Sequence, residues 1–271
     1  MRADESGGVG GSRPCCYDNE SVGFLTLHWR LGLFMNREYH KWYSPSLGRD
    51  MELLVFGHGG HPIIVFPTSK GRFWDYEERQ MIAVIGHKYE AGELQAYCVD
   101  SVDAESWYNR SAHPSARVAR HNQYEAYLLN EVIPFIRGRN RHPRLGATGC
   151  SFGGYHAVNL ALRHPDVVTD SISMGGAFDI HQFLDGYYDE NCYFHCPPDY
   201  MANLSDGWFF ERYRAGFRLV LATGERDICL EENLRLGRIL SEKGVPHWLD
   251  VWGDGTGHDW PWWRQMAVKF L

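Results

Sequence analysis

Residues 144–166 read RLGATGCSFGGYHAVNLALRHPD and carry the clearest structural pattern in the chain. Arg144–Thr148 predicts a strand and Gly153–Arg163 a helix that ends before a proline. Between them stands Gly149-Cys150-Ser151-Phe152-Gly153, a G-x-S-x-G pattern. A side chain at either glycine would collide with neighbouring backbone in so tight a turn. The pattern therefore predicts a strand–turn–helix unit that exposes the Ser151 hydroxyl at the carboxyl edge of a sheet.

Apolar strands and helices alternate on both sides of this unit, after an N-terminal antiparallel hairpin. The predicted strands are Tyr39–Tyr43, Met51–Phe56, Pro62–Phe66, Leu94–Val99, Ser171–Met174, Phe217–Thr223 and His247–Trp252. The predicted helices are Asp75–His87, Arg117–Arg137, Glu231–Lys243 and Trp260–Leu271. Such alternation predicts an α/β fold with a mostly parallel central sheet and helices on both faces.

The patterned sequence forms one domain, which we expect to span residues 35–271. Residues 1–34 are rich in Gly and Ser at their start and lack the pattern of a signal peptide, so we expect a disordered or non-native leader. Residues 178–213 are aromatic-rich and show no clean periodicity. They are too long for an ordinary loop, so we expect a small cap-like insertion over the site.

A serine hydroxyl needs a general base before it can act as a nucleophile. In strand–turn–helix units of this kind the acid and then the histidine follow the serine along the chain. His258, in a glycine-rich loop after the last strand, is the predicted base. Asp227 is the predicted acid, because it follows the preceding strand, and Glu225 competes for the same role. The predicted catalytic residues are thus Ser151, Asp227 and His258.

The developing oxyanion needs two N–H donors. The amide of Phe152, directly after the nucleophile, is the first. The second is expected in the loop after Pro62–Phe66, where Pro67 has no N–H to offer. Ser69 is the preferred donor, with Thr68 as the alternative.

Composition excludes several classes of protein. The net charge is -7, with 34 acidic and 27 basic residues and no long basic run, so no nucleic-acid partner is expected. No apolar run reaches the length of a membrane span. The seven cysteines form no metal-ligand array, which predicts reduced thiols in a cytoplasmic protein without a metal or cofactor. Nothing in the sequence indicates the oligomeric state.

Three segments together resemble the esterase D-type branch of the α/β-hydrolases, which includes feruloyl esterases, S-formylglutathione hydrolases and mycolyltransferases. They are GCSFGGYHAVNLALRHPD (149–166), the acid segment TGERD (223–227) and the histidine segment GHDWPWWR (257–264). The resemblance extends from Glu38 to Leu271 and implies an α/β-hydrolase fold. That branch usually has His-Gly after the early strand, whereas this chain has Phe66-Pro67-Thr68-Ser69, which weakens the transfer of the second oxyanion donor.

Three functions fit these residues. The preferred hypothesis is a serine carboxylesterase that cleaves short-chain, small-molecule esters through an acyl-enzyme on Ser151. An acyltransferase or thioesterase would use the same triad and differ only in what resolves the acyl-enzyme. A non-catalytic α/β-hydrolase scaffold would bind a ligand or partner. Degenerate scaffolds usually lack a triad member, whereas this chain has all three in order.

Overall fold

The computed structural model describes residues 35–271, and the predicted leader, residues 1–34, lies outside the described residues. Residues 35–271 fold around an eight-stranded sheet with the order β1-β2-β4-β3-β5-β6-β7-β8. Its strands are β1 (Arg37–Ser44), β2 (Arg49–Phe56), β3 (His61–Phe66), β4 (Leu94–Val99), β5 (Gly146–Cys150), β6 (Asp170–Met174), β7 (Arg218–Arg226) and β8 (Trp248–Gly257).

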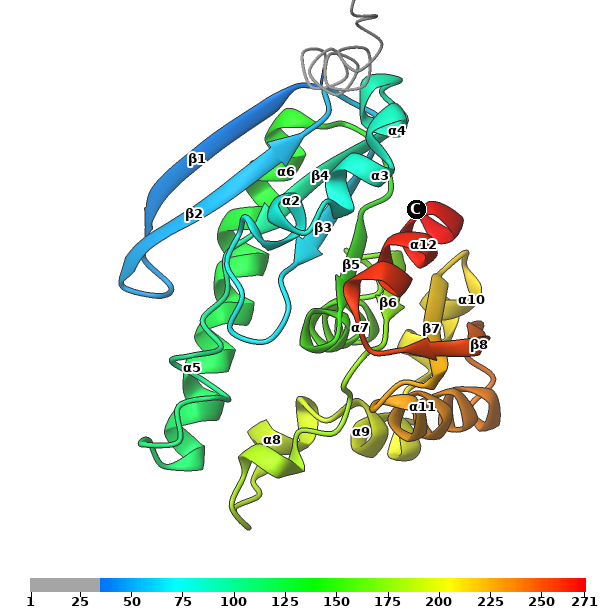
Figure 1. Ribbon diagram of the computed structural model, residues 1–271. Helices are drawn as coiled ribbons and strands as arrows, with labels where there is room; N and C mark the ends of the chain where they lie inside the picture. The colour runs from blue at the N-terminus through cyan, green and yellow to red at the C-terminus, as the bar shows by residue number, and fades with distance from the viewer. Residues whose placement is uncertain (1–34) are drawn as a thin grey trace, which may run out of the picture. The chain divides into compact units, whose positions relative to one another are not determined.

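The sheet is mostly parallel, as predicted. β2 runs antiparallel to both β1 and β4, and every pairing from β4 to β8 is parallel. Figure 1 shows the sheet from the hairpin of β1 and β2 to β8. Because parallel strands end at the same edge, the loops that follow β3, β5, β7 and β8 open on one side of the molecule.

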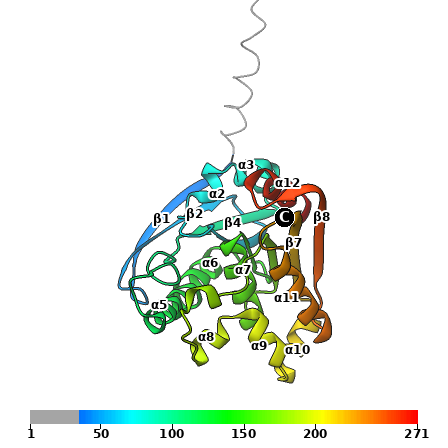
Figure 2. The ribbon, with the colours of Figure 1, turned by 60° about the horizontal axis from the view of Figure 1, so that its bottom comes forward.

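Helices cover both faces of the sheet, and each face has its own apolar core. The helices are α2 (Asp75–Glu78), α3 (Met81–Val84), α4 (Gly86–Glu90), α5 (Pro114–Tyr127), α6 (Ile133–Arg139), α7 (Phe152–Arg163), α8 (Glu190–Phe194), α9 (Pro197–Asn203), α10 (Gly207–Arg214), α11 (Leu230–Glu242) and α12 (Trp260–Phe270). In Figure 2, α2, α3 and α12 lie on one side of the sheet and α5, α6, α7 and α11 on the other. Successive strand residues alternate between the two cores, since side chains of a strand point to opposite faces.

The single helix predicted for Asp75–His87 was wrong. The structure has three short helices there, α2, α3 and α4. Gln80, between the first two, has a φ of 62°, in the left-handed region that a continuing helix does not visit. Ile85 separates the second from the third.

The helix predicted for Arg117–Arg137 is present but begins earlier and changes pitch. It starts at Pro114 and passes through the π-helical turn η1 (Leu128–Val132) into α6. Pro134, near the start of α6, has no N–H to give to the preceding turn, which is consistent with the wider turn before it.

The predicted cap-like insertion, residues 178–213, contains the 3-10 turn η2 (His181–Phe183) and the short helices α8, α9 and most of α10. Tyr155 and Tyr213 tie it to α7: Tyr155 Oη donates to the carbonyl of His195 at 2.9 Å, and Tyr213 Oη donates to that of Leu162 at 2.6 Å. Leu162 lies at the end of α7 remote from Ser151. The helices α8–α10 therefore lie along α7, and only the first part, around Phe183, approaches the site.

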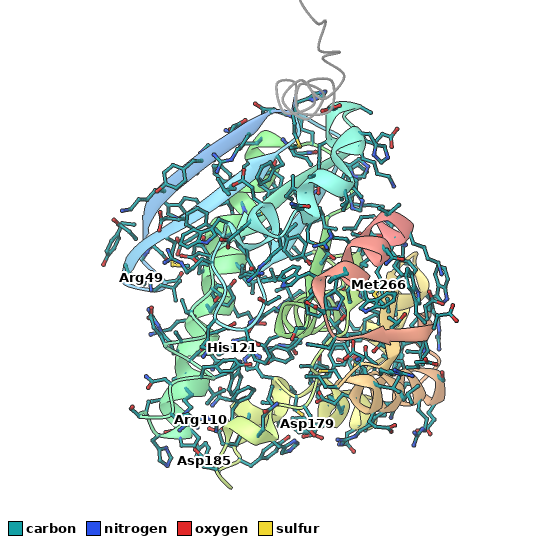
Figure 3. The ribbon with its side chains drawn as sticks, viewed as in Figure 1. Arg49, Arg110, His121, Asp179, Asp185 and Met266 are labelled. Atoms are coloured by element: carbon teal, nitrogen blue, oxygen red, sulfur yellow. The ribbon has the colours of Figure 1, made fainter. Side chains whose placement is uncertain are left out.

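Two arginines, one in the loop before α5 and one in α5 itself, anchor the start of the insertion. Arg110 Nη1 donates to the carbonyl of Gln182 at 2.7 Å. Figure 3 shows Arg110 beside Asp185, to which the same nitrogen lies at 3.4 Å. The buried Arg117 adds a 2.7 Å contact to the second oxygen of Asp185.

The structure of residues 35–271 bears on two expectations drawn from composition, one about membrane spans and one about the cysteines. Among these residues, no helix has both the length and the apolarity needed to cross a membrane. Five cysteines in this part of the chain are buried and free, namely Cys98, Cys150, Cys192, Cys196 and Cys229.

Candidate active site

The candidate residues come together because each directly follows a strand at the carboxyl edge of the sheet. Ser151 follows β5, Asp227 follows β7 and His258 follows β8. The loop Pro67–Lys70 follows β3, which pairs with β5. The parallel topology thus gathers four segments that are far apart in the sequence.

Ser151 sits on a strained turn. Its φ of 55° and ψ of -123° are sparsely populated for a residue with a side chain. A Cβ on Gly149 would lie 2.2 Å from the carbonyl carbon of Gly153. A Cβ on Gly153 would lie 2.5 Å from the carbonyl oxygen of Pro67. Both glycines of the pattern are therefore required by close backbone packing, and the second brings the β3 loop against the start of α7.

Ser151, His258 and Asp227 form a hydrogen-bonded chain. His258 Nε2 lies 2.9 Å from Ser151 Oγ, and His258 Nδ1 lies 2.7 Å from Asp227 Oδ1. Asp227 Oδ1 also accepts the amide of Cys229 at 2.8 Å. The Asp227 side chain is fully buried and the imidazole is 14% exposed. This arrangement leaves Nε2 in place to take a proton from Ser151.

The pairing of β7 with β8 places Asp227, rather than Glu225, beside His258. β7 does not end at Thr223, as the sequence suggested, but continues to Arg226, which pairs with Gly257. The residues that follow this pair are Asp227 and His258. Glu225 instead accepts the amide of Gly255 at 2.7 Å, within the irregular part of β8.

The β3 loop distinguishes the two candidate oxyanion donors. The amide and hydroxyl of Thr68 both donate to Asp75 Oδ2, each at 2.9 Å. Within residues 35–271, the amides of Ser69 and Phe152 have no hydrogen-bond partner. The Thr68 amide is thus already bonded to Asp75, whereas the amides of Ser69 and Phe152 are free to donate to a substrate oxygen. Asp75, which holds this loop, was missed from the sequence because it reads only as an acidic first residue of a helix.

Aromatic side chains line the site next to the β3 loop. Tyr108 Oη donates to Ser69 Oγ at 2.7 Å, and burial raises the pKa of Tyr108. Its ring packs on Phe183 at 4.8 Å and on Phe152 at 5.4 Å between centroids. The ammonium of Lys70 lies 5.4 Å from the Tyr108 ring. A cavity of about 520 Å³, lined by residues such as Phe194 and Phe209, lies instead at the far end of α7.

A buried His–Asp pair also lies next to the site. His156, on α7, lies 2.9 Å from Asp103, and both side chains are almost fully buried. The second carboxylate oxygen of Asp103 accepts the amide of Lys70 at 3.3 Å. The pair thereby connects α7 to the β3 loop. Sequence reasoning missed it, because the two residues lie far apart in the chain.

Two groups of side chains have donor atoms close enough to share a metal ion. Within residues 35–271 these are Asp227, Cys229 and His258, and separately Asp179, His181 and Cys196. In the first group the aspartate and histidine already bond to each other, and burial raises the pKa of Cys229 to about 12, so this thiol stays protonated. In the second, His181 Nδ1 bonds to Asp179 at 2.6 Å. The expectation that no metal is bound stays a prediction.

Comparison with known proteins agrees with the fold. A family model described as "Putative esterase" matches residues 44–269. No sequence among the curated proteins is a close enough match to serve as a relative.

Solved structures of similar fold share little sequence with this chain. A ferulic acid esterase has a TM-score of 0.70 at 18% identity, covering 88% of this chain and 96% of its own. The S-formylglutathione hydrolase FrmB from Staphylococcus aureus has a TM-score of 0.63 at 17% identity, with coverage of 87% and 94%. An S-formylglutathione hydrolase from Agrobacterium tumefaciens has a TM-score of 0.66 at 15% identity, covering 87% of this chain and 93% of its own. At these identities the likeness concerns the fold.

Proposed function

The chain belongs to the esterase family whose model spans residues 44–269, and from this premise we propose that it is a serine carboxylesterase acting through Ser151. The observation that carries the proposal is the continuous chain of hydrogen bonds from Ser151 through His258 to the buried Asp227. Family membership supports ester hydrolysis in general. The covalent mechanism and the preference for short acyl chains are the proposed additions.

In the proposed first half-reaction, Ser151 Oγ attacks the carbonyl carbon of the ester. His258 Nε2 accepts the hydroxyl proton and passes it to the departing alkoxide, which leaves as an alcohol. Asp227 accepts the hydrogen bond from Nδ1 and stabilises the imidazolium that forms. The product on the enzyme is an ester of Ser151.

The amides of Phe152 and Ser69 are proposed to stabilise the negative oxygen of each tetrahedral intermediate. Backbone donors fixed by the start of α7 and by the Asp75-anchored loop need little rearrangement during the reaction, which makes such donors effective. In the second half-reaction, His258 takes a proton from water, which attacks the acyl-enzyme. As that intermediate collapses, His258 returns the proton to Ser151 Oγ, which releases the acid and restores the serine hydroxyl.

Replacing Ser151 tests the mechanism. We expect Ser151→Ala to lower kcat for a nitrophenyl ester on the order of 10⁴-fold or more while the protein stays folded. The wild type should react covalently with a fluorophosphonate, and the variant should not. Near-normal turnover by Ser151→Ala, or equal labelling of both proteins, would exclude this serine as the nucleophile.

A preference for short acyl chains is proposed because the aromatic rings of Tyr108, Phe152 and Phe183 pack closely beside the β3 loop. No long apolar lid helix is present among residues 35–271, where the helices of the insertion have eight residues or fewer. In a panel of nitrophenyl esters of increasing chain length, kcat/KM should be highest for the shortest acyl groups. Faster turnover of long-chain esters, or activation at a lipid surface, contradicts this proposal.

A further inference from the structure

Two buried polar atoms beside the triad have no hydrogen-bond partner within residues 35–271. One is Oδ2 of Asp227 and the other is the indole Nε1 of Trp263. The first oxygen of the same carboxylate, Oδ1, accepts two hydrogen bonds, from His258 and from the amide of Cys229. Because nearly all buried polar atoms in folded proteins are bonded, two orphans in one place call for a physical explanation.

The two orphan atoms lie around the same small space. Gly175, which has a φ of 62°, leaves this space open because it has no Cβ. A Cβ at this position would lie 2.6 Å from Asp227 Oδ2 and 3.1 Å from Trp263 Nε1. An indole N–H only donates and a carboxylate oxygen only accepts. The two neighbouring atoms are therefore complementary in hydrogen-bonding capacity, although no hydrogen bond joins them within residues 35–271.

The start of α12 holds Trp263 in this place. Asp259 caps the helix: its side chain accepts the amide of Trp260 at 2.7 Å, and its carbonyl accepts the amide of Trp263 at 3.2 Å. The Trp263 ring packs edge-on against His258, with 4.9 Å between centroids. It is almost fully buried. The same short segment thus presents both the imidazole and the indole to Asp227.

We propose that Trp263 is a positioning residue: a small shift from the present geometry lets its indole N–H donate to Oδ2 of Asp227, and this contact keeps Oδ1 directed at His258. The inference rests on the proposed function, since positioning matters only if Asp227 serves the triad. A carboxylate held by three N–H donors cannot rotate away when His258 becomes an imidazolium. Gly175 is required because a Cβ there would crowd both the donor and the acceptor.

A double-mutant cycle tests this role. Trp263→Phe keeps a ring against His258 but removes the N–H. It should lower kcat on the order of tenfold with little change in KM, the size expected for one hydrogen bond to a charged group. In an Asp227→Ala background, where no carboxylate remains to be positioned, the same change should cost less than about twofold. Equal losses in both backgrounds, or no loss in the wild type, would overturn the proposal.

The matched control is Trp252→Phe. It also removes an indole N–H that donates to a carboxylate, here Asp250 at 2.6 Å, but away from the triad, so kcat should not change. The two single variants also distinguish the failure of the proposed function from the failure of the positioning role. If Asp227→Ala alone retains full activity, the triad itself fails. If Asp227→Ala is impaired but Trp263→Phe shows no coupling to it, only the positioning role fails.

A second measurement leaves Trp263 in place, in case Trp263→Phe does not fold. In protein labelled with ¹⁵N-tryptophan, one indole proton should resonate far downfield and exchange slowly in the wild type. It should lose both properties in Asp227→Ala. If every indole resonance is unaffected by Asp227→Ala, the proposal is overturned.

Discussion

Gly175 shows how one missing side chain can support a reaction centre. Its φ of 62° and the 2.6 Å approach to Asp227 Oδ2 leave no room for a Cβ. Gly175→Ala should therefore displace Asp227 and His258, and kcat should fall on the order of 10²-fold, the cost of misplacing catalytic groups by about 1 Å. The measurement is steady-state hydrolysis of a short nitrophenyl ester, with Tm recorded in parallel.

A matched control for Gly175→Ala is Gly186→Ala. Gly186 also has a positive φ, 85°, but a Cβ there would have nothing within 4 Å. Both variants bear the left-handed strain of about 1–2 kcal/mol, and only the first bears the clash. Full activity in Gly175→Ala would mean that the space beside Asp227 is not needed.

The insertion and α7 behave as one packed unit. Tyr213 Oη donates to the carbonyl of Leu162 at 2.6 Å inside the protein. Tyr213→Phe leaves that buried carbonyl without this donor, which should lower the free energy of unfolding by about 1–3 kcal/mol. Because α7 is about 18 Å long, and Leu162 and Ser151 lie at its opposite ends, kcat should not change. Urea denaturation and ester hydrolysis measure the two effects.

The control for Tyr213→Phe is Tyr43→Phe, at an exposed position where 64% of the residue's surface is accessible. This variant should change neither stability nor activity. A large loss of kcat in Tyr213→Phe would show instead that the helices α8–α10 influence the reaction, as expected of a cap. That role stays a prediction, since these helices lie along α7 and only η2 approaches the site.

For the fold of residues 35–271, buried histidines make stability dependent on pH. His195 is almost fully buried, and burial, followed by the charge of Arg163, lowers its pKa to about 3. Its Nε2 lies 2.6 Å from Asn122 Oδ1, and its Nδ1 lies 3.1 Å from Asn159 Nδ2 and 2.7 Å from Arg163 Nη1, which suits a neutral imidazole that donates from Nε2 and accepts at Nδ1. Burial also lowers the pKa of His121 well below its ordinary value.

The sign of this dependence follows from proton binding. An unfolded chain protonates histidine near its ordinary pKa of about 6.5, whereas the folded protein protonates His195 only near 3. Between these values the unfolded state binds more protons, so the free energy of unfolding should fall as pH drops below about 6.5. His195→Gln should make this fall shallower, as measured by urea denaturation from pH 7 to pH 4.

His87→Gln provides the comparison, because His87 is exposed on α4 and should leave the slope unchanged. A slope that is identical in wild type and His195→Gln would contradict the assignment of His195 as a buried neutral group. At neutral pH the glutamine variant should lose some stability, because its amide replaces an imidazole in a packed cluster.

Local sequence alone predicted the parallel sheet and the strand–turn–helix unit at Ser151. These features depend on short-range causes: runs of apolar residues, and glycines that permit a tight turn. The same local reasoning failed for Asp75–His87 and for the ends of β7 and β8, because β8 continues to Gly257 through the glycines that the sequence assigns to a loop. There the backbone conformation of Gln80 and the pairing with β8 decided the outcome, and neither is visible in periodicity.

The sequence favours one of two close alternatives at each of two positions in the site, and the tertiary structure supplies the physical reason that separates them. The choice of Asp227 over Glu225 depends on the pairing of Arg226 with Gly257, and the choice of Ser69 over Thr68 depends on the hydrogen bonds from Thr68 to Asp75. The first choice arises from a pairing across two strands, and the second from a contact between a loop and the helix that follows it. A sequence determines which groups can bond, whereas strand register and packing determine which of them meet.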